Sequence, residues 1–94
     1  MPDTKPAITH DESLGRFSTN VDGHTCVLDY QLRDNTLIIQ HTGVPAPVEG
    51  RGIAAALTRQ ALETARERKW RVMPLCSYAV AYLARHPDYQ DLLA

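Results

Sequence analysis

The sequence predicts an α+β fold of α/β-like character, in which a mixed β-sheet packs against two main helices in the order β-β-β-α-β-α. Apolar and polar side chains alternate with a period of two over residues 16–44, which indicates an antiparallel meander. A helical apolar period begins at Ile53. The apolar run at 70–75 then predicts a strand parallel to the third, because a crossover helix normally returns the chain in that direction.

The first twelve residues contain few apolar side chains. Pro2 and Pro6 lie among them, so we expect 1–12 to be a flexible lead-in with at most one short strand near Ile8. No repeat, low-complexity tract or linker divides the rest of the chain. The sequence therefore predicts a single domain over 13–94.

Turn signals separate the strands of the meander, which are expected at 16–21, 24–33 and 36–44. Asp22-Gly23 marks the first turn and Asp34-Asn35 the second. One face of the second strand is apolar and is expected to enter the core; it holds Cys26, Leu28, Tyr30 and Leu32.

His41 shares a side of the third strand with Leu37 and Ile39 if the alternation is regular. Two interpretations follow. A histidine among apolar neighbours is usually structural and bonded to the backbone, but it can also titrate near neutrality and act as a base.

Gly50 and Gly52 lie immediately before the long helix, after two prolines that end the third strand. Without a Cβ, these glycines let main-chain N–H groups approach an anion closely, and the helix start adds unpaired N–H groups and a positive dipole end. An ordinary turn is the alternative. A nucleotide bound at the same helix start is less favoured, because no Lys-Ser or Lys-Thr follows the glycines as in a P-loop.

A second helix is expected from Ser77, as its cap, to Arg85, since Pro87 stops the pattern. Residues 88–93 can add a last turn. The pair Arg85-His86 is most simply a solvated helix end, and we assign it no role.

Composition narrows the class of protein further. Ten basic and eleven acidic residues leave a net charge of −1, so no broad basic field favours nucleic acid. Cys26 and Cys76 are too far apart for a metal knuckle, and no apolar run approaches the length of a membrane span. We expect a cytoplasmic protein with free thiols, no metal and no membrane partner, as a monomer or weak homodimer.

The order of elements, with the glycine loop opening the central helix, resembles the core of the GNAT acetyltransferase superfamily, whose acetyl-CoA loop follows Q/R-x-x-G-x-G/A. More narrowly, four segments resemble the short, single-domain GNAT-like proteins. They are His41-Thr42-Gly43-Val44-Pro45, the glycine loop at 49–54, Pro74-Leu75-Cys76-Ser77-Tyr78 and Ala84-Arg85-His86-Pro87. The resemblance covers residues 14–94.

This resemblance implies a protein that takes acetyl-CoA as cosubstrate and moves its acetyl group to an amine of a small molecule or protein. It also implies a set of cosubstrate contacts: Thr42, Val44, Gly50, Arg51, Gly52, Ile53 and Ala54. Two positions depart from the family pattern. Glu49 stands where Gln or Arg is usual, and Gly43 stands where the short family has an acidic residue, so the phosphate contact rests on main-chain donors.

Three residues are candidates for catalysis: Cys76, His41 and Tyr78. Cys76 precedes a predicted helix, whose dipole favours a thiolate, and the resemblance places it near the thioester. Transfer through acetyl-cysteine and direct attack by an amine both remain open. His41 would be the base and Tyr78 a proton donor, although packing is the simpler role for a tyrosine one helical turn from Tyr82. The alternative function is a CoA-binding or protein-interaction module with little or no catalysis.

Overall fold

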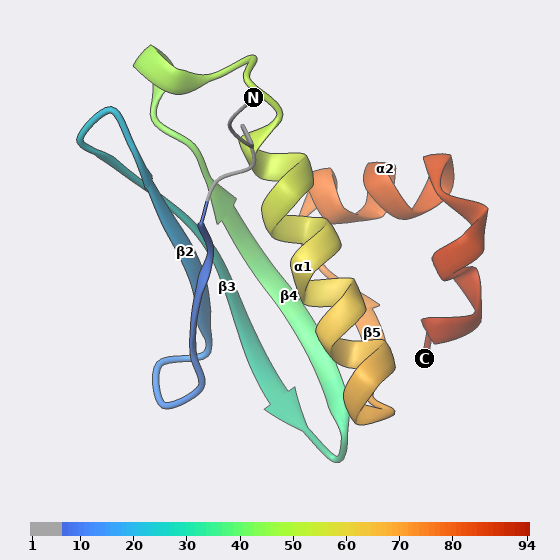
Figure 1. Cartoon of the computed structure of the whole chain (residues 1–94). Helices are drawn as coiled ribbons and strands as arrows, with labels where there is room; N and C mark the ends of the chain where they lie inside the picture. The colour runs from blue at the N-terminus through green and yellow to red at the C-terminus, as the bar shows by residue number, and fades with distance from the viewer. Residues whose placement is uncertain (1–6) are drawn as a thin grey trace.

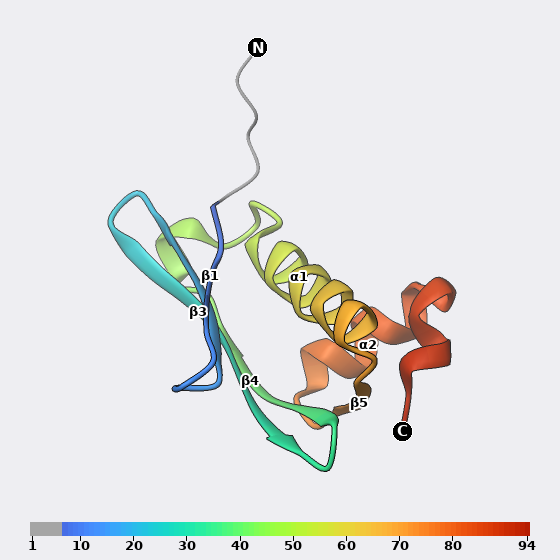
Figure 2. The same cartoon turned by 60° about the horizontal axis from the view of Figure 1, so that its bottom comes forward.

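The computed structural model describes residues 7–94 and contains one five-stranded sheet with helices on one of its faces (Figures 1 and 2). The strands are β1 Thr9–Asp11, β2 Arg16–Val21, β3 His24–Arg33, β4 Thr36–Gly43 and β5 Arg71–Pro74. The helices are α1 Ile53–Arg68 and α2 Ser77–Arg85, with the short 3₁₀ helices η1 Ala46–Val48 and η2 Pro87–Leu92. Among residues 7–94, no helix is long and apolar enough to cross a lipid bilayer.

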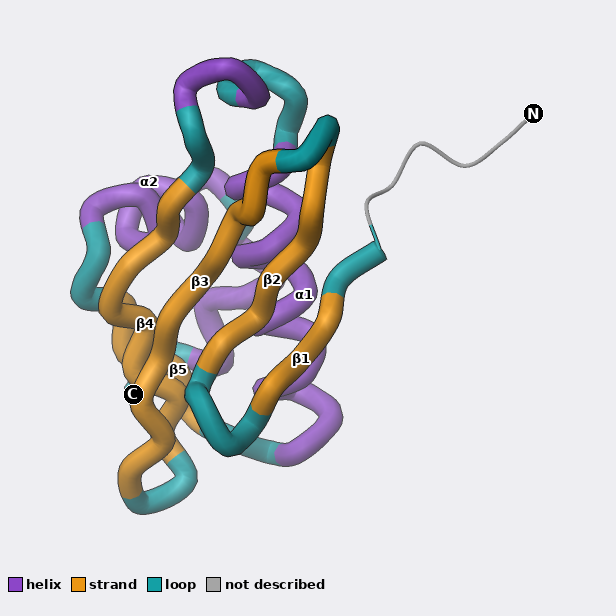
Figure 3. Tube along the Cα trace, turned by 90° about the vertical axis from the view of Figure 1, so that its left-hand side faces the viewer, coloured by secondary structure: helices purple, strands orange, loops and turns teal. Residues whose placement is uncertain are grey.

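The strands lie in the order β1-β2-β3-β4-β5. Neighbours from β1 to β4 are antiparallel, and β5 joins β4 in parallel after the crossover through α1. The predicted mixed sheet is thus confirmed. Figure 3 looks onto the sheet with both helices behind it, and no helix of the described residues covers the face toward the viewer.

The short strand expected near Ile8 is present as β1. His10 anchors this strand: the centroid of its ring lies 4.0 Å from that of the stacked Phe17 ring, and its Nε2 is hydrogen-bonded to the Tyr30 hydroxyl at 2.6 Å. Burial lowers the pKa of His10, which favours its neutral ring. A strand of three residues is too short for an alternation of apolar and polar side chains to be recognised in the sequence. The rest of the predicted lead-in, residues 1–6, lies outside the described part of the chain.

A β-bulge in β4 changes which side chains face the helices. Asp29 of β3 is opposite His41, but the next residue, Tyr30, is opposite Ile39, so Gln40 is an extra residue. Beyond it Thr42 pairs with buried Leu28 and shares its face, whereas His41 is exposed on the uncovered face. The prediction that His41 shares a side with Ile39 is therefore wrong, because a bulge breaks the alternation on which it depended.

The core lies between α1 and the covered face of the sheet. The helix contributes side chains with no exposed surface at the predicted spacing: Leu57, Ala61, Leu62 and Ala65. The strands contribute Phe17, Leu28, Leu37, Ile39 and Val72, also fully buried. Burial of this apolar surface fixes α1 on the sheet and so fixes the position of its N-terminus relative to the end of β4.

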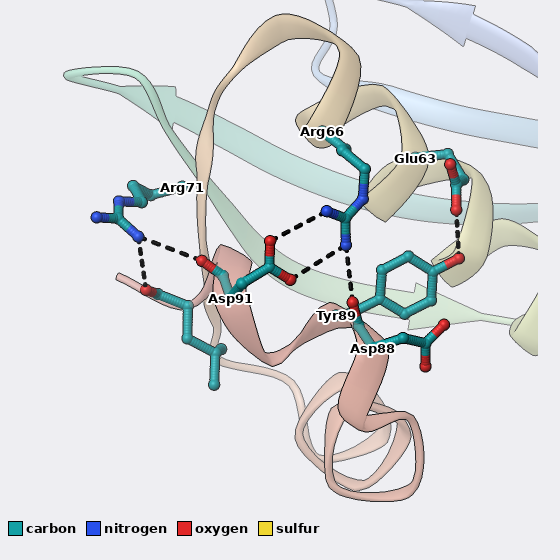
Figure 4. A network of polar contacts seen from close by, with 7 residues as sticks. Glu63, Arg66, Arg71, Asp88, Tyr89 and Asp91 are labelled. Carbon is teal, nitrogen blue, oxygen red and sulfur yellow. Dashed lines mark hydrogen bonds and ion pairs between the residues drawn. The ribbon is translucent and has the colours of Figure 1, made fainter.

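Polar contacts hold the C-terminal segment against α1 (Figure 4). Arg66 donates to both carboxylate oxygens of Asp91, at 3.0 and 3.1 Å, and to the carbonyl of Asp88 at 2.8 Å. The Tyr89 hydroxyl donates to Glu63. Burial and this carboxylate raise the pKa of Tyr89 to about 12, so its hydroxyl stays a donor. These contacts fasten η2, and with it the end of α2, to α1.

Candidate functional site

Beyond Ile39, no strand of the described residues pairs with the outer edge of β4, the edge on the side of β5. Its pairing with β5 ends at Ile39 and Pro74. The N–H groups of Leu75 and Cys76 both donate to the Ile39 carbonyl, at 2.9 and 3.3 Å, and the chain then turns into α2. Since β4 continues to Gly43, its last residues extend past the end of β5. An extended ligand could pair with this main chain as a further strand does.

A cleft of about 510 Å³ lies between the end of β4 and the first turn of α1. Six of the seven predicted contact residues line it: Thr42, Val44, Gly50, Gly52, Ile53 and Ala54. Arg51 is not among the lining residues. Its guanidinium instead donates to Asp22 on the β2–β3 turn at 2.6 Å. The structure therefore brings the glycine loop to the cleft but holds the Arg51 side chain away.

The first turn of α1 presents main-chain donors to this cleft. The helix has Gly52 as its N-cap residue, no side chain caps it, and the first turn contains no acidic residue. N–H groups at a helix start lack intrahelical partners and carry the positive end of the dipole. A Cβ placed on Gly50 or Gly52 would meet no protein atom within 4 Å, so the loop is open to a ligand. Such a cradle suits a phosphate group.

Glu49 also lines the cleft, and its negative charge works against an anion there. Its side chain is exposed, however, and can turn toward water. Anion binding at this loop therefore depends on the backbone donors from Gly50 onward rather than on a side chain at position 49.

Cys76 lies next to the cleft, at the N-cap of α2. Its Sγ accepts the Ala79 N–H at 3.4 Å and lies 3.5 Å from Oγ1 of Thr42, a residue of the cleft wall. The prediction that Ser77 caps this helix is wrong: Cys76 has the extended backbone of a cap residue, and Ser77 is the first helical residue. The half-buried sulfur therefore lies at a helix start, within reach of a main-chain N–H group.

Residues 16–92 match the family model described as GCN5-related N-acetyl-transferase. The chain belongs to this family. It is 31% identical to Protein NATD1 of Xenopus tropicalis, covering 97% of this chain and 86% of that protein, and 32% identical to Protein NATD1 of Mus musculus, covering 90% and 80%. A GCN5-like protein from Staphylococcus aureus solved by NMR has a TM-score of 0.75 and 27% identity, covering 98% of this chain and 91% of that one. The predicted family and fold are thus confirmed.

Tyr78 stands at the wall of the cleft in this GNAT chain. Burial raises its pKa, so the phenol keeps its proton at neutral pH and remains a hydrogen-bond donor. It lies on α2 two residues after Cys76. The structure therefore brings Thr42 and Tyr78 to the cleft wall and places Cys76 beside Thr42.

His41 lies on the other side of β4, on the face that no described helix covers. A Cβ on Gly43 would be 3.0 Å from its Nε2 and 3.6 Å from Val27. The imidazole thus occupies the space that a side chain at position 43 would enter. Of the three catalytic candidates, His41 is the one that this GNAT fold does not bring to the cleft.

A second cavity, of about 460 Å³, lies between α1 and α2. Its wall includes Arg59, Tyr82, Arg85 and His86, to which sequence reasoning gave no binding role. One signal was available: Tyr78, Tyr82 and His86 recur every four residues and so share one side of a helix. What lay opposite that side could not be known without the packing of α2 on α1.

Proposed function

We propose that this protein binds acetyl-CoA in the cleft and transfers its acetyl group to an amine. The observation that carries the proposal is the uncapped start of α1, opened by Gly50 and Gly52 and continuous with a cleft that reaches Thr42. The N–H groups of the first turn would hold the pyrophosphate. The open edge of β4 would pair with the amides of the pantetheine arm, which leads the thioester to Thr42 and Cys76. A cytoplasmic location, where acetyl-CoA is available, belongs to the same proposal.

Direct transfer needs an amine in its neutral form. Its nitrogen attacks the thioester carbonyl carbon, the carbon–sulfur bond breaks, and the bonding electron pair leaves with sulfur. The Tyr78 hydroxyl can give that sulfur a proton, and the phenolate recovers one from water. The amine loses its own proton to water, or to His41 if it approaches β4 from the uncovered face, where that exposed imidazole lies.

Transfer through Cys76 divides the reaction into two steps. The Cys76 thiolate first attacks the thioester carbonyl carbon, which forms acetyl-cysteine and releases the CoA thiolate. The neutral amine then attacks the acetyl-cysteine carbonyl, which forms the amide and returns the Cys76 thiolate. The Ala79 N–H, 3.4 Å from Sγ, would stabilise the thiolate in both steps.

Calorimetry tests the proposed function directly. Titration of the folded protein with acetyl-CoA is expected to give saturable binding at one site per chain, because the cleft and the helix start form a single continuous site. Inorganic phosphate should compete weakly, since it would fill only the pyrophosphate position. A folded sample that takes up no acetyl-CoA would refute the proposal.

Intact-mass measurement separates the two routes. If Cys76 accepts the acetyl group, incubation with acetyl-CoA should add one acetyl group to the wild type and none to Cys76→Ala. Cys26→Ala is the matched control, because Cys26 is the other free thiol and is buried in β3 away from the cleft. An unmodified wild type that still acetylates an amine panel would rule out the cysteine route and leave direct transfer.

A CoA-binding or protein-interaction module is the second candidate function. Two observations favour it: His41 is outside the cleft, and position 43 provides no carboxylate. Neither position 41 nor position 43 can therefore supply a general base within the cleft. Saturable acetyl-CoA binding without turnover of any amine would support this function over the transferase.

A further inference from the structure

Exposed apolar side chains are concentrated in one short segment of the chain. The described residues include six large apolar side chains that are exposed, and four of them lie within residues 73–80. Met73 is 43% exposed, Leu75 61% and Val80 51%, while the fourth, Tyr78, lines the cleft. Single exposed apolar residues are ordinary, but a contiguous group indicates a surface that another molecule covers.

Three of these side chains lie together at the uncovered face of the sheet, which is turned to the viewer in Figure 3. Met73 is opposite half-buried Ile38 in the pairing of β5 with β4. Leu75 lies two residues further along an extended chain and therefore points to the same side as Met73. Leu75 and Val80 are the N′ and N4 residues of α2, whose side chains commonly pack together at a helix start. We call this group the apolar patch: Ile38, Met73, Leu75 and Val80.

Acidic residues are absent from the two segments that form this surface. The chain contains eleven acidic residues, but none lies in residues 36–48, which include β4, or in residues 69–87, which include β5 and α2. The apolar patch is therefore free of negative charge from its own segments.

Two arginines lie beside the apolar patch. Arg33, Thr36 and Arg71 are opposite one another on β3, β4 and β5, in the row next to that of Ile38 and Met73. Within residues 7–94, neither arginine takes part in an ion pair. The Arg71 guanidinium donates to two main-chain carbonyl groups of the C-terminal segment, at 3.3 and 3.4 Å, which leaves its charge uncompensated.

The carboxylates around this part of the sheet do not neutralise the two arginines. Asp29 accepts two hydrogen bonds from Arg16, at 2.7 and 3.3 Å. Asp91 accepts two from Arg66, at 3.0 and 3.1 Å. Asp34 lies in the β3–β4 turn, and it forms no ion pair among the residues that the structure describes. The surface thus combines exposed apolar area with positive charge.

We propose that the apolar patch and these two arginines form a docking surface for a protein segment with apolar and acidic side chains. The apolar side chains of the partner would cover the patch, and its carboxylates would pair with Arg33 and Arg71. Charge complementarity favours an acidic segment over a basic one. A second copy of this chain fits less well, because a two-fold contact at the patch would bring the arginines of both copies together. The surface is separate from the proposed acetyl-CoA site, since no residue of the apolar patch lines the cleft.

Two synthetic peptides test the docking surface by NMR titration of the isotope-labelled chain. Both have the pattern X-Leu-X-Leu-X-Leu-X with blocked ends, where X is Glu in the acidic peptide and Lys in the basic peptide. The acidic peptide is expected to cause saturable shifts in the amides of β4, β5 and α2. It should bind at least about 10-fold more tightly than the basic peptide, or about 1.4 kcal/mol.

The double variant Leu75→Ser/Val80→Ser removes the two most exposed side chains of the patch and should weaken binding of the acidic peptide at least about 10-fold. Both side chains are more than half exposed, so their replacement should leave the fold intact. Leu14→Ser/Leu32→Ser is the matched control. These two leucines are also exposed, at 68% and 44%, but lie outside the patch, and their replacement should keep the wild-type affinity.

A second pair of variants tests the charge. Arg33→Gln/Arg71→Gln should bind the acidic and the basic peptide about equally, because the two charges that distinguish them are gone. The control Arg59→Gln/Arg85→Gln removes two exposed arginines that line the α1–α2 cavity instead, and it should keep the preference for the acidic peptide.

Any of three results would overturn this inference. The first is an acidic peptide that binds no more tightly than the basic one, or does not bind at all. The second is binding that Leu75→Ser/Val80→Ser leaves unchanged. The third is a wild type that sediments as a dimer and becomes a monomer in that variant, which would make a second copy the occupant. None of these results concerns acetyl-CoA binding, which calorimetry measures separately.

Discussion

Replacement of Gly52 by leucine is expected to weaken acetyl-CoA binding by about 100-fold or more, or about 2.7 kcal/mol. Gly52 has φ of 77° at the cap of α1, and the space beside its Cα is empty of protein atoms. A side chain there would point into the space that the pyrophosphate needs and would move the N–H groups of the first turn. Calorimetry with the folded variant gives the affinity directly.

Gly23→Leu is the control for this substitution. Gly23 lies in the β2–β3 turn with φ of 79°, and a Cβ there also meets no atom within 4 Å. Both variants should lose about 1–2 kcal/mol of unfolding free energy, because a left-handed backbone disfavours any residue with a Cβ by about this amount. Only Gly52→Leu should lose affinity. Equal affinity of the two variants would mean that acetyl-CoA does not use the glycine loop.

Replacement of Phe17 by alanine is expected to have the largest effect on stability, a loss of about 3–5 kcal/mol of unfolding free energy. Phe17 has no exposed surface, and its ring centroid lies 4.0 Å from that of His10 and 5.5 Å from that of Tyr30. Its loss would leave a cavity under α1 and would remove the stack that anchors β1. Denaturant unfolding measures the change.

Phe17→Leu separates the cavity from the stack. Leucine keeps most of the buried apolar volume but cannot stack on His10, so this variant should retain more than half of the stability that alanine loses. Because Phe17 lies in β2 and not at the cleft, neither variant should change acetyl-CoA affinity under conditions where the protein is folded. A loss below about 1 kcal/mol for alanine would mean that the site collapses without a cavity.

Local patterns were sufficient to predict most of the fold. The β2 and β3 strands have the predicted bounds because strict alternation is bracketed by turns whose central residues take positive φ, namely Asp22, Gly23, Asp34 and Asn35. The start of α1 follows from two glycines and the apolar period after them. Such signals lie within a few residues of each other, and tertiary packing did not override them.

The remaining features depend on contacts between distant parts of the chain. β1 is anchored by His10 against Phe17 and Tyr30, which are remote in sequence. The sulfur of Cys76 is within 3.5 Å of Thr42 only because β5 ends where it does. The glycine loop of the site was predicted from its own residues. The α1–α2 cavity was not, because neither helix alone shows what the other places opposite it.

The Gln40 bulge also limits how residue roles can be carried between members of this family. A relative with one residue fewer at this point keeps the same strand faces as this chain, because regular alternation then leads from Ile39 to the same orientation of His41 and Thr42. In a relative of equal length with a regular strand, the residues aligned with His41 and Thr42 lie on the opposite faces of the sheet. In an alignment, a gap at position 40 therefore preserves the roles, whereas an ungapped match does not guarantee that aligned side chains point to the same side of the sheet.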